Sequence, residues 1–211
     1  MKISIIGTGM IATEVIKMLR NEAKGIKITS IFSHSNKEKA LTLAKENDID
    51  HVYTDYAQLL KEDDADFVYI ALVNNAHYTY VRQALEAQRN VIVEKPFTST
   101  LEEAKLLAQM AREHGLYLFE AVTPLHTPNF QLVKQSLKRI APIHFAQCNF
   151  SQYSSRYERY LQGDIAPAFN PELGGGALND LNVYNINIIV GLFGEPISNQ
   201  YFANHGHNGV D

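Results

Sequence analysis

The sequence predicts an α/β protein whose first part is a doubly wound parallel sheet. Two observations support this prediction. Short apolar runs alternate with longer amphipathic patterns over the first 120 residues, and a glycine-rich turn directly follows the first apolar run. Strands that alternate with helices pair in parallel through right-handed crossovers, and this arrangement places helices on both faces of one sheet.

The expected elements of this first part follow from periodicity and from turn residues. Five apolar runs read as strands, and four segments with apolar residues three or four positions apart read as helices. The last helix has a threonine cap at Thr98 or Thr100 and ends before Gly115. The strands are expected at 2–7, 26–32, 67–72, 90–95 and 116–121, and the helices at 10–20, 36–47, 77–88 and 100–115.

The pattern changes after about residue 123, which predicts a second domain. A short helix at 129–140 precedes a long strand at 142–155, and a glycine-rich segment then leads into another helix within 171–196. A further strand is expected at 197–206. We therefore expect two domains, residues 1–122 and 123–211, the second being an incomplete α+β domain.

Composition limits the class of partner. The 211 residues carry a formal net charge of −4, which does not suggest a basic surface for nucleic acid or for an anionic membrane. Cys148 is the only cysteine, so an internal disulfide is excluded. No apolar run approaches the ~20 residues of a membrane span, and the first residues lack the pattern of a signal peptide. We expect a soluble cytoplasmic protein.

The turn "GTGMIA" at residues 7–12 is the first candidate binding element. Gly7 allows a tight turn, and Gly9 lets backbone amides approach a pyrophosphate at the start of a helix opened by Met10 and Ile11. Such a motif is weak evidence alone, and the alternative is an ordinary strand-to-helix turn. Because it opens a βαβ unit, it predicts dinucleotide binding in a Rossmann domain.

The end of the second strand bears on cofactor choice. An NAD-specific fold usually places an Asp or Glu there to bind the ribose 2′-hydroxyl, but this chain has Ser33 and His34, followed by Lys37. Hydroxyls and a cation suit a 2′-phosphate, so we expect NADP, with NAD possible. The alternative is a solvated loop that contacts no ligand.

Polar residues also follow the third and fourth of these strands. Ligands of open α/β sheets lie beyond the carboxyl ends of the strands, so Leu72, Asn74 and His77 are expected to meet the cofactor. His77 also fits a helix-start residue. Lys95 would point over the nicotinamide site and hold a substrate hydroxyl, while Glu94 holds a ribose hydroxyl or orients the lysine. The alternative for this pair is a surface ion pair.

The glycine-rich segment precedes the last candidates. On a helix, Asp180, Tyr184 and Asn187 lie at i, i+4 and i+7 and form one polar stripe, while leucines and isoleucines cover the other faces. Buried carboxyl and phenol groups require partners, which a reactive cleft can supply. The alternative is a hydrogen-bonded core helix.

Together these motifs resemble the glucose-fructose oxidoreductase / inositol dehydrogenase / MocA family of nicotinamide-dependent oxidoreductases. The resemblance rests on "GTGMIA", "VNNAH", "EKPFTSTLEEAKLLAQMAREHGLYLFEA" and "NPELGGGALNDLNVYNINIIVGLFGEP", in this order. It is strongest with the branch of dihydrodiol and xylose dehydrogenases. It implies that Lys95 is catalytic and that Asp180 and Tyr184 line the substrate site, with the Tyr184 phenol as the proton donor.

The resemblance implies hydride transfer between nicotinamide and a hydroxyl or carbonyl carbon of a sugar, polyol or cyclic diol. Family members continue into an open, mostly antiparallel sheet that often forms a dimer interface, so we expect this chain to be a fragment and the full-length form to be a homo-oligomer. Two departures are Val73 in place of a proline and Asn182 in place of a glycine. The alternatives are a non-catalytic dinucleotide-binding sensor and an inactive truncated chain.

Overall fold

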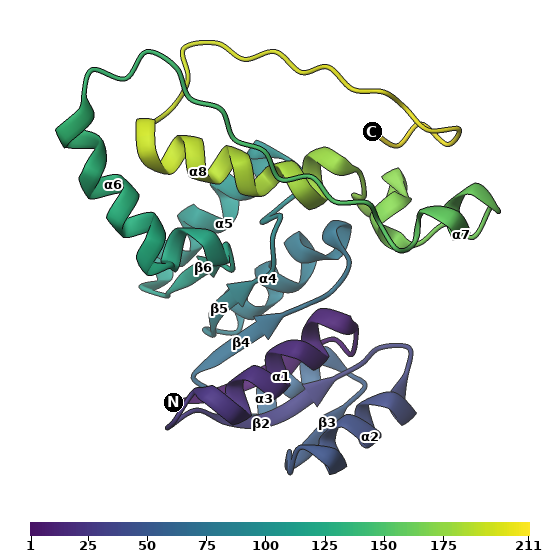
Figure 1. The fold of residues 1–211 in the computed structure, drawn as a ribbon. Coiled ribbons are helices and arrows are strands. Elements are labelled where there is room, and N and C mark those ends of the chain that lie inside the picture. Colours follow the sequence, from purple (N-terminus) through teal and green to yellow (C-terminus); the bar gives the residue numbers. More distant parts are fainter. The chain divides into compact units, whose positions relative to one another are not determined.

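The computed structural model describes residues 1–211, which divide into two compact units, Met1–Ala121 and Val122–Asp211 (Figure 1). The first unit contains one six-stranded parallel sheet with the order β3-β2-β1-β4-β5-β6. Its strands are β1 (Lys2–Ile6), β2 (Lys27–Phe32), β3 (His51–Tyr53), β4 (Phe67–Ile70), β5 (Asn90–Val93) and β6 (Leu118–Glu120). The predicted doubly wound parallel sheet is thus confirmed.

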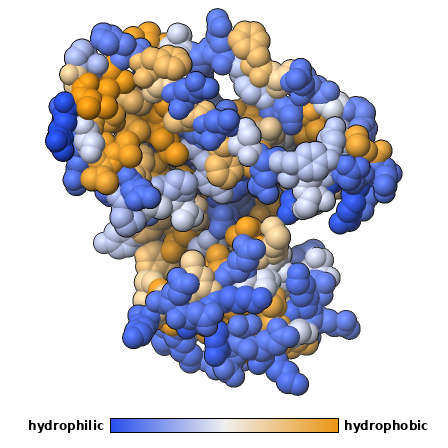
Figure 2. All heavy atoms as spheres, viewed as in Figure 1, coloured by the Kyte–Doolittle hydropathy of each residue, from blue (hydrophilic) through white to orange (hydrophobic).

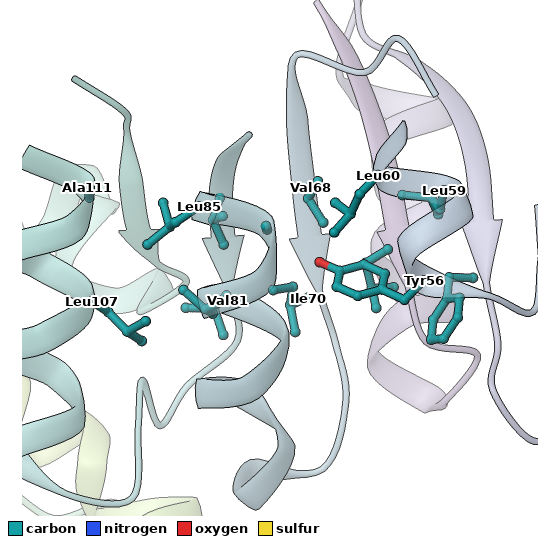
Figure 3. Close-up of a cluster of buried hydrophobic side chains, with 14 residues drawn as sticks. Tyr56, Leu59, Leu60, Val68, Ile70, Val81, Leu85, Leu107 and Ala111 are labelled. Atoms are coloured by element: carbon teal, nitrogen blue, oxygen red, sulfur yellow. The ribbon is translucent and has the colours of Figure 1, made fainter. Parts of the chain in front are cut away.

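Five α-helices cover both faces of this sheet. They are α1 (Met10–Glu22), α2 (Lys37–Glu46), α3 (Tyr56–Glu62), α4 (His77–Glu86) and α5 (Leu101–His114), and the short η1 (Asn74–Ala76) precedes α4. Side chains of α1 and α2 pack in one apolar cluster, and those of α3, α4 and α5 pack in another. Figure 3 shows the latter cluster, in which Tyr56 of α3 lies next to Ile70 of β4, and Leu107 of α5 lies next to Val81 of α4.

The α5 helix has the ends that its sequence predicts. The Thr100 hydroxyl accepts from the Glu103 amide, and the Glu103 carboxylate accepts in return from the Thr100 amide, which completes a capping box. Gly115 adopts a left-handed conformation directly after the helix. Two short elements, β3 and α3, were not predicted, because three and seven residues are too few to show a period.

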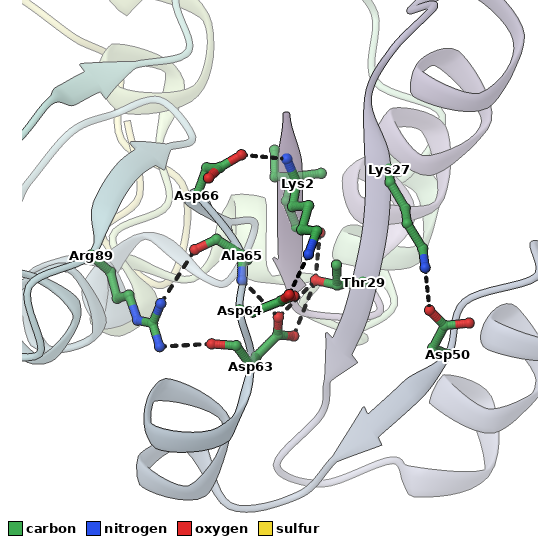
Figure 4. Close-up of polar contacts among 10 residues, drawn as sticks. Lys2, Lys27, Thr29, Asp50, Asp63, Asp64, Ala65, Asp66 and Arg89 are labelled. Atoms are coloured by element: carbon green, nitrogen blue, oxygen red, sulfur yellow. Dashed lines mark hydrogen bonds and ion pairs between the residues drawn. The ribbon is translucent and has the colours of Figure 1, made fainter.

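A polar network joins the segments at the amino-terminal edge of the sheet (Figure 4). The buried Asp63 carboxylate accepts hydrogen bonds from the Thr29 hydroxyl and from the Ala65 amide. The Arg89 guanidinium donates to the carbonyl oxygens of Leu60, Asp63 and Ala65 at 2.7 to 3.3 Å. Arg89 therefore satisfies carbonyls at the end of α3 that have no partner within the helix.

We expect Arg89→Met to lower the free energy of unfolding by about 2 kcal/mol, because three carbonyls lose a charged donor. The control is Arg82→Met. The exposed pair that Arg82 forms with Glu86 at 2.9 Å should contribute no more than about 0.5 kcal/mol. Urea denaturation measures both variants, and equal losses would contradict the role of Arg89.

The second unit consists of helices and irregular segments. Its elements are η2 (Thr123–His126), α6 (Pro128–Ile140), α7 (Tyr157–Leu161), η3 (Pro167–Phe169), η4 (Pro171–Leu173), the π-helix η5 (Leu178–Asn182) and α8 (Val183–Phe193). Tyr160 is its most buried aromatic residue. Its ring stacks on Phe169 and His207, and its hydroxyl donates to the Asn208 side chain at 2.9 Å.

The strands predicted at 142–155 and 197–206 are wrong for these residues, because neither segment is in a sheet. A strand is stable only when a neighbour satisfies its amides and carbonyls, and neither segment has such a neighbour in the sheet order. The second unit is therefore helical where an α+β domain was expected. Apolar side chains gather on its surface over α6 and α8, neither of which contains a fully buried residue (Figure 2).

Candidate active site

The turn after β1 lies where the order of the strands reverses, between β2 and β4. The Gly7 amide donates to the Phe32 carbonyl at 2.9 Å, and Gly7 has a φ of +123°. A Cβ on Gly7 would lie 2.4 Å from the Ala71 carbonyl oxygen. Only glycine combines this backbone conformation with this close approach, so the turn is brought against the segment that follows β4.

Gly9 has a different environment from Gly7. It is the N-cap of α1, no side chain accepts from the first amides of this helix, and a Cβ on Gly9 would meet no atom within 4 Å. Met10 and Ile11 open the helix and are exposed. Free amides at the start of a 13-residue helix, beside a position without a side chain, fit the pyrophosphate of a dinucleotide.

The loop after β2 orients its own hydroxyl group. Ser33 is buried, its amide donates to the Tyr53 carbonyl, and its Oγ accepts from the Asn36 amide at 3.1 Å. The Ser33 hydroxyl still has its proton available for donation, whereas the adjacent His34 is exposed. Of the two residues predicted to meet a 2′-phosphate, His34 is therefore the accessible one.

The segment after β4 brings His77 into the core. Leu72 packs on the cluster of α3, α4 and α5, Asn74 begins η1, and His77 begins α4 with 0% of its surface exposed. The His77 Nδ1 lies 2.8 Å from the Pro96 carbonyl oxygen, and its Nε2 lies 3.2 Å from the Leu72 carbonyl oxygen. Both ring nitrogens therefore face the chain itself, as expected of a helix-start residue within the core.

The charge state of His77 follows from this burial. Burial lowers the pKa of His77 below its ordinary value of 6.5, although the two carbonyl contacts act in the opposite direction. A neutral imidazole has a single N–H to donate. The shorter contact assigns this proton to Nδ1, so the ring donates to the Pro96 carbonyl.

The segment Glu94–Phe97, which we call the lysine loop, follows β5. The Glu94 amide donates to the Ile70 carbonyl, and the Glu94 carboxylate accepts from the Tyr69 hydroxyl at 2.5 Å. The Phe97 amide donates to Glu120 Oε1 at 2.9 Å. The Lys95–Pro96 peptide bond is cis. Lys95 is half-buried at the carboxyl-terminal edge of the sheet, between these anchored neighbours.

Tyr69 and Glu120 were not predicted as site residues. Tyr69 lies within the apolar run of β4, where an aromatic residue reads as core. Glu120 ends β6 and offered a usable signal, because it is a charged residue at the carboxyl end of a strand, close to where Glu94 follows β5. Burial raises the pKa of both carboxyl groups, and the hydrogen bond from Tyr69 offsets part of the rise for Glu94.

We expect Glu120→Gln to stabilise the protein by an increment that grows with pH. The pKa of Glu120 is raised by burial and by the nearby Glu94, so folding favours the neutral carboxyl group. The stability from this preference is present below the unfolded pKa and is lost as pH rises through the folded pKa. Glutamine stays neutral, and its amide oxygen can still accept from Phe97.

Thermal unfolding followed by circular dichroism tests this expectation. The variant should have a higher Tm than the wild type at about pH 8. This difference should shrink toward about pH 4, where the Glu120 carboxyl group becomes protonated in both the folded and the unfolded protein. Glu113→Gln, at an exposed position of α5, serves as the control. An advantage of Glu120→Gln that is independent of pH would contradict the assigned cause.

The second unit holds the other two predicted catalytic residues. Asp180 lies in the π-helix η5, and Tyr184 is the second residue of α8, with its ring centroid 5.0 Å from that of Phe150. The expected regular stripe is wrong, because a π-helix has a wider turn than an α-helix and shifts the angular spacing. Asn187 donates to the Val183 carbonyl of its own helix at 2.9 Å. Single π-turns are frequent at functional sites.

The glycine-rich segment before the π-helix is packed against the end of the chain. The Leu178 amide donates to the Asp211 carboxylate at 2.7 Å, and the Ala177 amide donates to the Asp211 main-chain oxygen at 3.2 Å. Gly176 has a φ of +120°, and a Cβ there would clash with the Asp211 carboxylate. A side-chain acceptor therefore serves an amide at the start of the segment that carries Asp180.

None of the helices combines the length and apolar character required to cross a membrane.

Comparisons with known proteins place these features in context. Residues 1–122 match the family model GFO_IDH_MocA, described as an oxidoreductase family with an NAD-binding Rossmann fold. The uncharacterized oxidoreductase YgjR of Escherichia coli is 35% identical over 210 residues, which are 100% of this chain and 63% of that protein. The scyllo-inositol 2-dehydrogenase (NADP(+)) IolU of Bacillus subtilis is 32% identical over 195 residues, which are 92% of this chain and 59% of that protein.

A solved structure is also similar to this chain in fold and sequence. It is a mutant of KijD10, a 3-ketoreductase from Actinomadura kijaniata, in complex with TDP-benzene and NADP. It is 29% identical, with a TM-score of 0.74 over 92% of this chain and 56% of that chain. The relatives also include trans-1,2-dihydrobenzene-1,2-diol dehydrogenases and a D-xylose 1-dehydrogenase, as the resemblance implied. This chain spans less than two thirds of the length of the relatives described above.

Proposed function

Because the chain belongs to the oxidoreductase family with an NAD-binding Rossmann fold, we propose that it forms the cofactor-binding part of an NADP-dependent oxidoreductase. The reaction moves a hydride between nicotinamide and a hydroxyl- or carbonyl-bearing carbon of a polyol, sugar or cyclic diol. The name of IolU, an NADP-dependent inositol dehydrogenase, supports this substrate class. KijD10, a ketoreductase solved with NADP, supports the cofactor.

The observation that carries the proposal is that Lys95 follows β5 at the carboxyl-terminal edge of the sheet, the same edge that carries the glycine turn after β1. Gly7 abuts Ala71, and His77 contacts Pro96 of the lysine loop. The glycine turn, the segment after β4 and the lysine loop are thus joined by direct contacts at one edge. This edge is where open α/β sheets bind their ligands.

The residues of the first unit have separable roles in this proposal. The amides after Gly7 and Gly9, with Met10 and Ile11, hold the pyrophosphate, and Ser33 and His34 bind the 2′-phosphate. Leu72 and Asn74 border the bound dinucleotide. NADP supplies the hydride donor or acceptor when bound.

The catalytic residues act on the substrate oxygen. Lys95 donates a hydrogen bond to this oxygen and stabilises the negative charge that develops there. Tyr184 gives a proton to this oxygen in the direction of reduction and takes it back in the direction of oxidation. Asp180 is assigned to hold the geometry of Tyr184. The Glu94 carboxylate accepts from the Tyr69 hydroxyl, so we assign Glu94 to orienting the lysine loop and not to binding a ribose hydroxyl.

The cofactor proposal is tested by fluorescence titration with NADPH and NADH. We expect NADPH to bind more tightly, and we expect His34→Asp to weaken NADPH binding at least about tenfold, because a carboxylate repels the 2′-phosphate. The affinity for NADH should change by less than about threefold. Asp64→Ala, at an exposed position of the opposite sheet edge, is the control. Equal affinities for both nucleotides would contradict the assignment of this loop.

The activity itself is tested by following NADPH oxidation with a panel of ketoses, inososes and cyclic diketones. The reverse reaction is tested by following NADP reduction with the corresponding alcohols. Turnover with any of these supports the proposal. Tight binding of NADPH without turnover would instead support a non-catalytic dinucleotide-binding protein.

We propose two further properties on the same basis. The lone Cys148 supports a reducing, cytoplasmic setting. We also propose a homo-oligomer that acts on a small-molecule substrate. The net charge of −4 argues against nucleic acid as a partner.

A further inference from the structure

The lysine loop is held by side chains from three different elements. Tyr69 of β4 donates to the Glu94 carboxylate, His77 of α4 contacts the Pro96 carbonyl, and Glu120 of β6 accepts from the Phe97 amide. These contacts join residues 25, 19 and 23 positions apart in the chain. The loop that carries Lys95 is therefore fixed by tertiary contacts and not by its own sequence alone.

Two of these contacts meet on one peptide group. The Pro96 carbonyl and the Phe97 amide belong to the same planar unit, which His77 holds at its oxygen and Glu120 holds at its nitrogen, at 2.8 and 2.9 Å. A planar group held at both polar ends has little freedom to rotate. Proline also restricts its own φ, so the orientation of this peptide is passed back to the Lys95 backbone.

We propose that His77 and Glu120 are positioning residues that fix the direction of Lys95 by holding the Pro96–Phe97 peptide from both sides. This inference rests on the proposed function, in which Lys95 contacts the substrate oxygen. Neither residue touches the substrate or the cofactor in this assignment. Both act through the backbone of the lysine loop.

The environment of each residue favours this role over a direct one. The His77 ring is fully buried, and both of its nitrogens face backbone carbonyls, so a ligand could reach the ring only if the surrounding chain moved. Glu120 is a partly buried carboxylate near the Glu94 carboxylate, an arrangement that costs stability. Because the Glu120 carboxylate accepts from the Phe97 amide despite this cost, its side chain fits a positioning role.

Matched variants separate positioning from bulk. His77→Asn retains a donor at the δ position and should still reach the Pro96 carbonyl, whereas His77→Leu removes it. Glu120→Gln retains the acceptor for Phe97, whereas Glu120→Leu removes it. We expect the two leucine variants to lower kcat about tenfold to a hundredfold, because small misplacements of a catalytic group are this costly. The asparagine and glutamine variants should stay within about threefold of wild type.

The Michaelis constant for the nucleotide supplies a second readout. It should change by less than about threefold in all four variants, because none of these side chains is assigned to the cofactor. Arg89→Met is the stability control, since it weakens the opposite edge of the sheet and should leave kcat unchanged. A merely structural role would instead lower kcat in proportion to stability in Arg89→Met as well.

Nuclear magnetic resonance tests the geometry without turnover. The Phe97 amide should exchange with solvent at least about tenfold faster in Glu120→Leu and at the wild-type rate in Glu120→Gln. In protein with ¹³C-methylated lysines, the Lys95 signal, assigned with Lys95→Arg, should shift in both leucine variants and stay in place in the conservative ones. An unmoved Lys95 signal in the leucine variants overturns the proposal.

The two proposals can fail separately. If no substrate is turned over but the Lys95 signal moves as expected, the proposed function fails and the holding of the loop stands. If Lys95→Ala abolishes turnover while His77→Leu and Glu120→Leu keep the wild-type kcat, the proposed function stands and the positioning role is wrong.

Discussion

Lys95→Ala is expected to lower kcat by about 10² to 10⁴-fold, the range in which a single catalytic proton-transfer or charge-stabilising group contributes. Lys95 follows β5 at the carboxyl-terminal edge of the sheet, and the proposed function assigns to it the substrate oxygen on which negative charge develops. Alanine leaves that charge without a donor. Stopped-flow or steady-state measurement of NADPH oxidation provides the readout.

The same variant should keep its nucleotide affinity within about tenfold, because the pyrophosphate and 2′-phosphate are assigned to other residues. Lys61→Ala removes an exposed lysine from the last turn of α3 and should leave both turnover and affinity unchanged. Normal turnover by Lys95→Ala would remove this residue from the chemistry. A loss of affinity that matches the loss of turnover would make Lys95 a binding residue only.

Much of the first unit could be predicted because its signals are local. The strand-to-helix alternation, the glycine turn at Gly7 and Gly9, and the capping box at Thr100 each depend on residues within a few positions of one another. Parallel pairing then places the carboxyl ends of the strands on one edge, so the position of Lys95 followed from topology without knowledge of any contact.

The contacts that hold the lysine loop could not be predicted in the same way. The sequence shows that His77, Glu120 and Tyr69 are present, but not that they meet a loop about twenty positions away, because such distances depend on how helices and strands pack. For His77, the sequence allowed either contact with the cofactor or a place at the start of a helix. Its full burial is a tertiary property.

The second unit shows the opposite limit. The segments 142–155 and 197–206 carry the interleaved polar and apolar residues of strands, yet a strand forms only where another strand offers its amides and carbonyls. The π-helix at Leu178–Asn182 was also beyond prediction, because a single wider turn leaves no periodic signature in five residues. Asp180 could therefore be identified as a candidate, but its orientation relative to Tyr184 could not.

The two glycines of the turn after β1 should respond to the same substitution in opposite ways. Gly7→Ala is expected to lower the free energy of unfolding by at least about 3 kcal/mol, because alanine disfavours a φ of +123° and its Cβ would lie 2.4 Å from the Ala71 carbonyl oxygen. That oxygen belongs to the backbone between β4 and η1, so the sheet edge would have to move.

Gly9→Ala is the matched variant, with the same chemical change two residues away. Gly9 has a φ of −67°, and its Cβ would meet no protein atom within 4 Å, so the loss of stability should stay below about 1 kcal/mol. The added methyl group would instead occupy the space through which a pyrophosphate approaches the amides of α1. We expect NADPH affinity to fall at least about tenfold.

Urea denaturation without nucleotide and NADPH titration distinguish these outcomes. We expect Gly7→Ala to lose stability, because Gly7 lies against the protein backbone. We expect Gly9→Ala to lose NADPH affinity, because Gly9 is assigned to the ligand. If Gly9→Ala bound NADPH with wild-type affinity, the turn would be an ordinary strand-to-helix connection, and the nucleotide would have to be held elsewhere. If Gly7→Ala were as stable as Gly9→Ala, the close approach to Ala71 would not be a constraint on the fold.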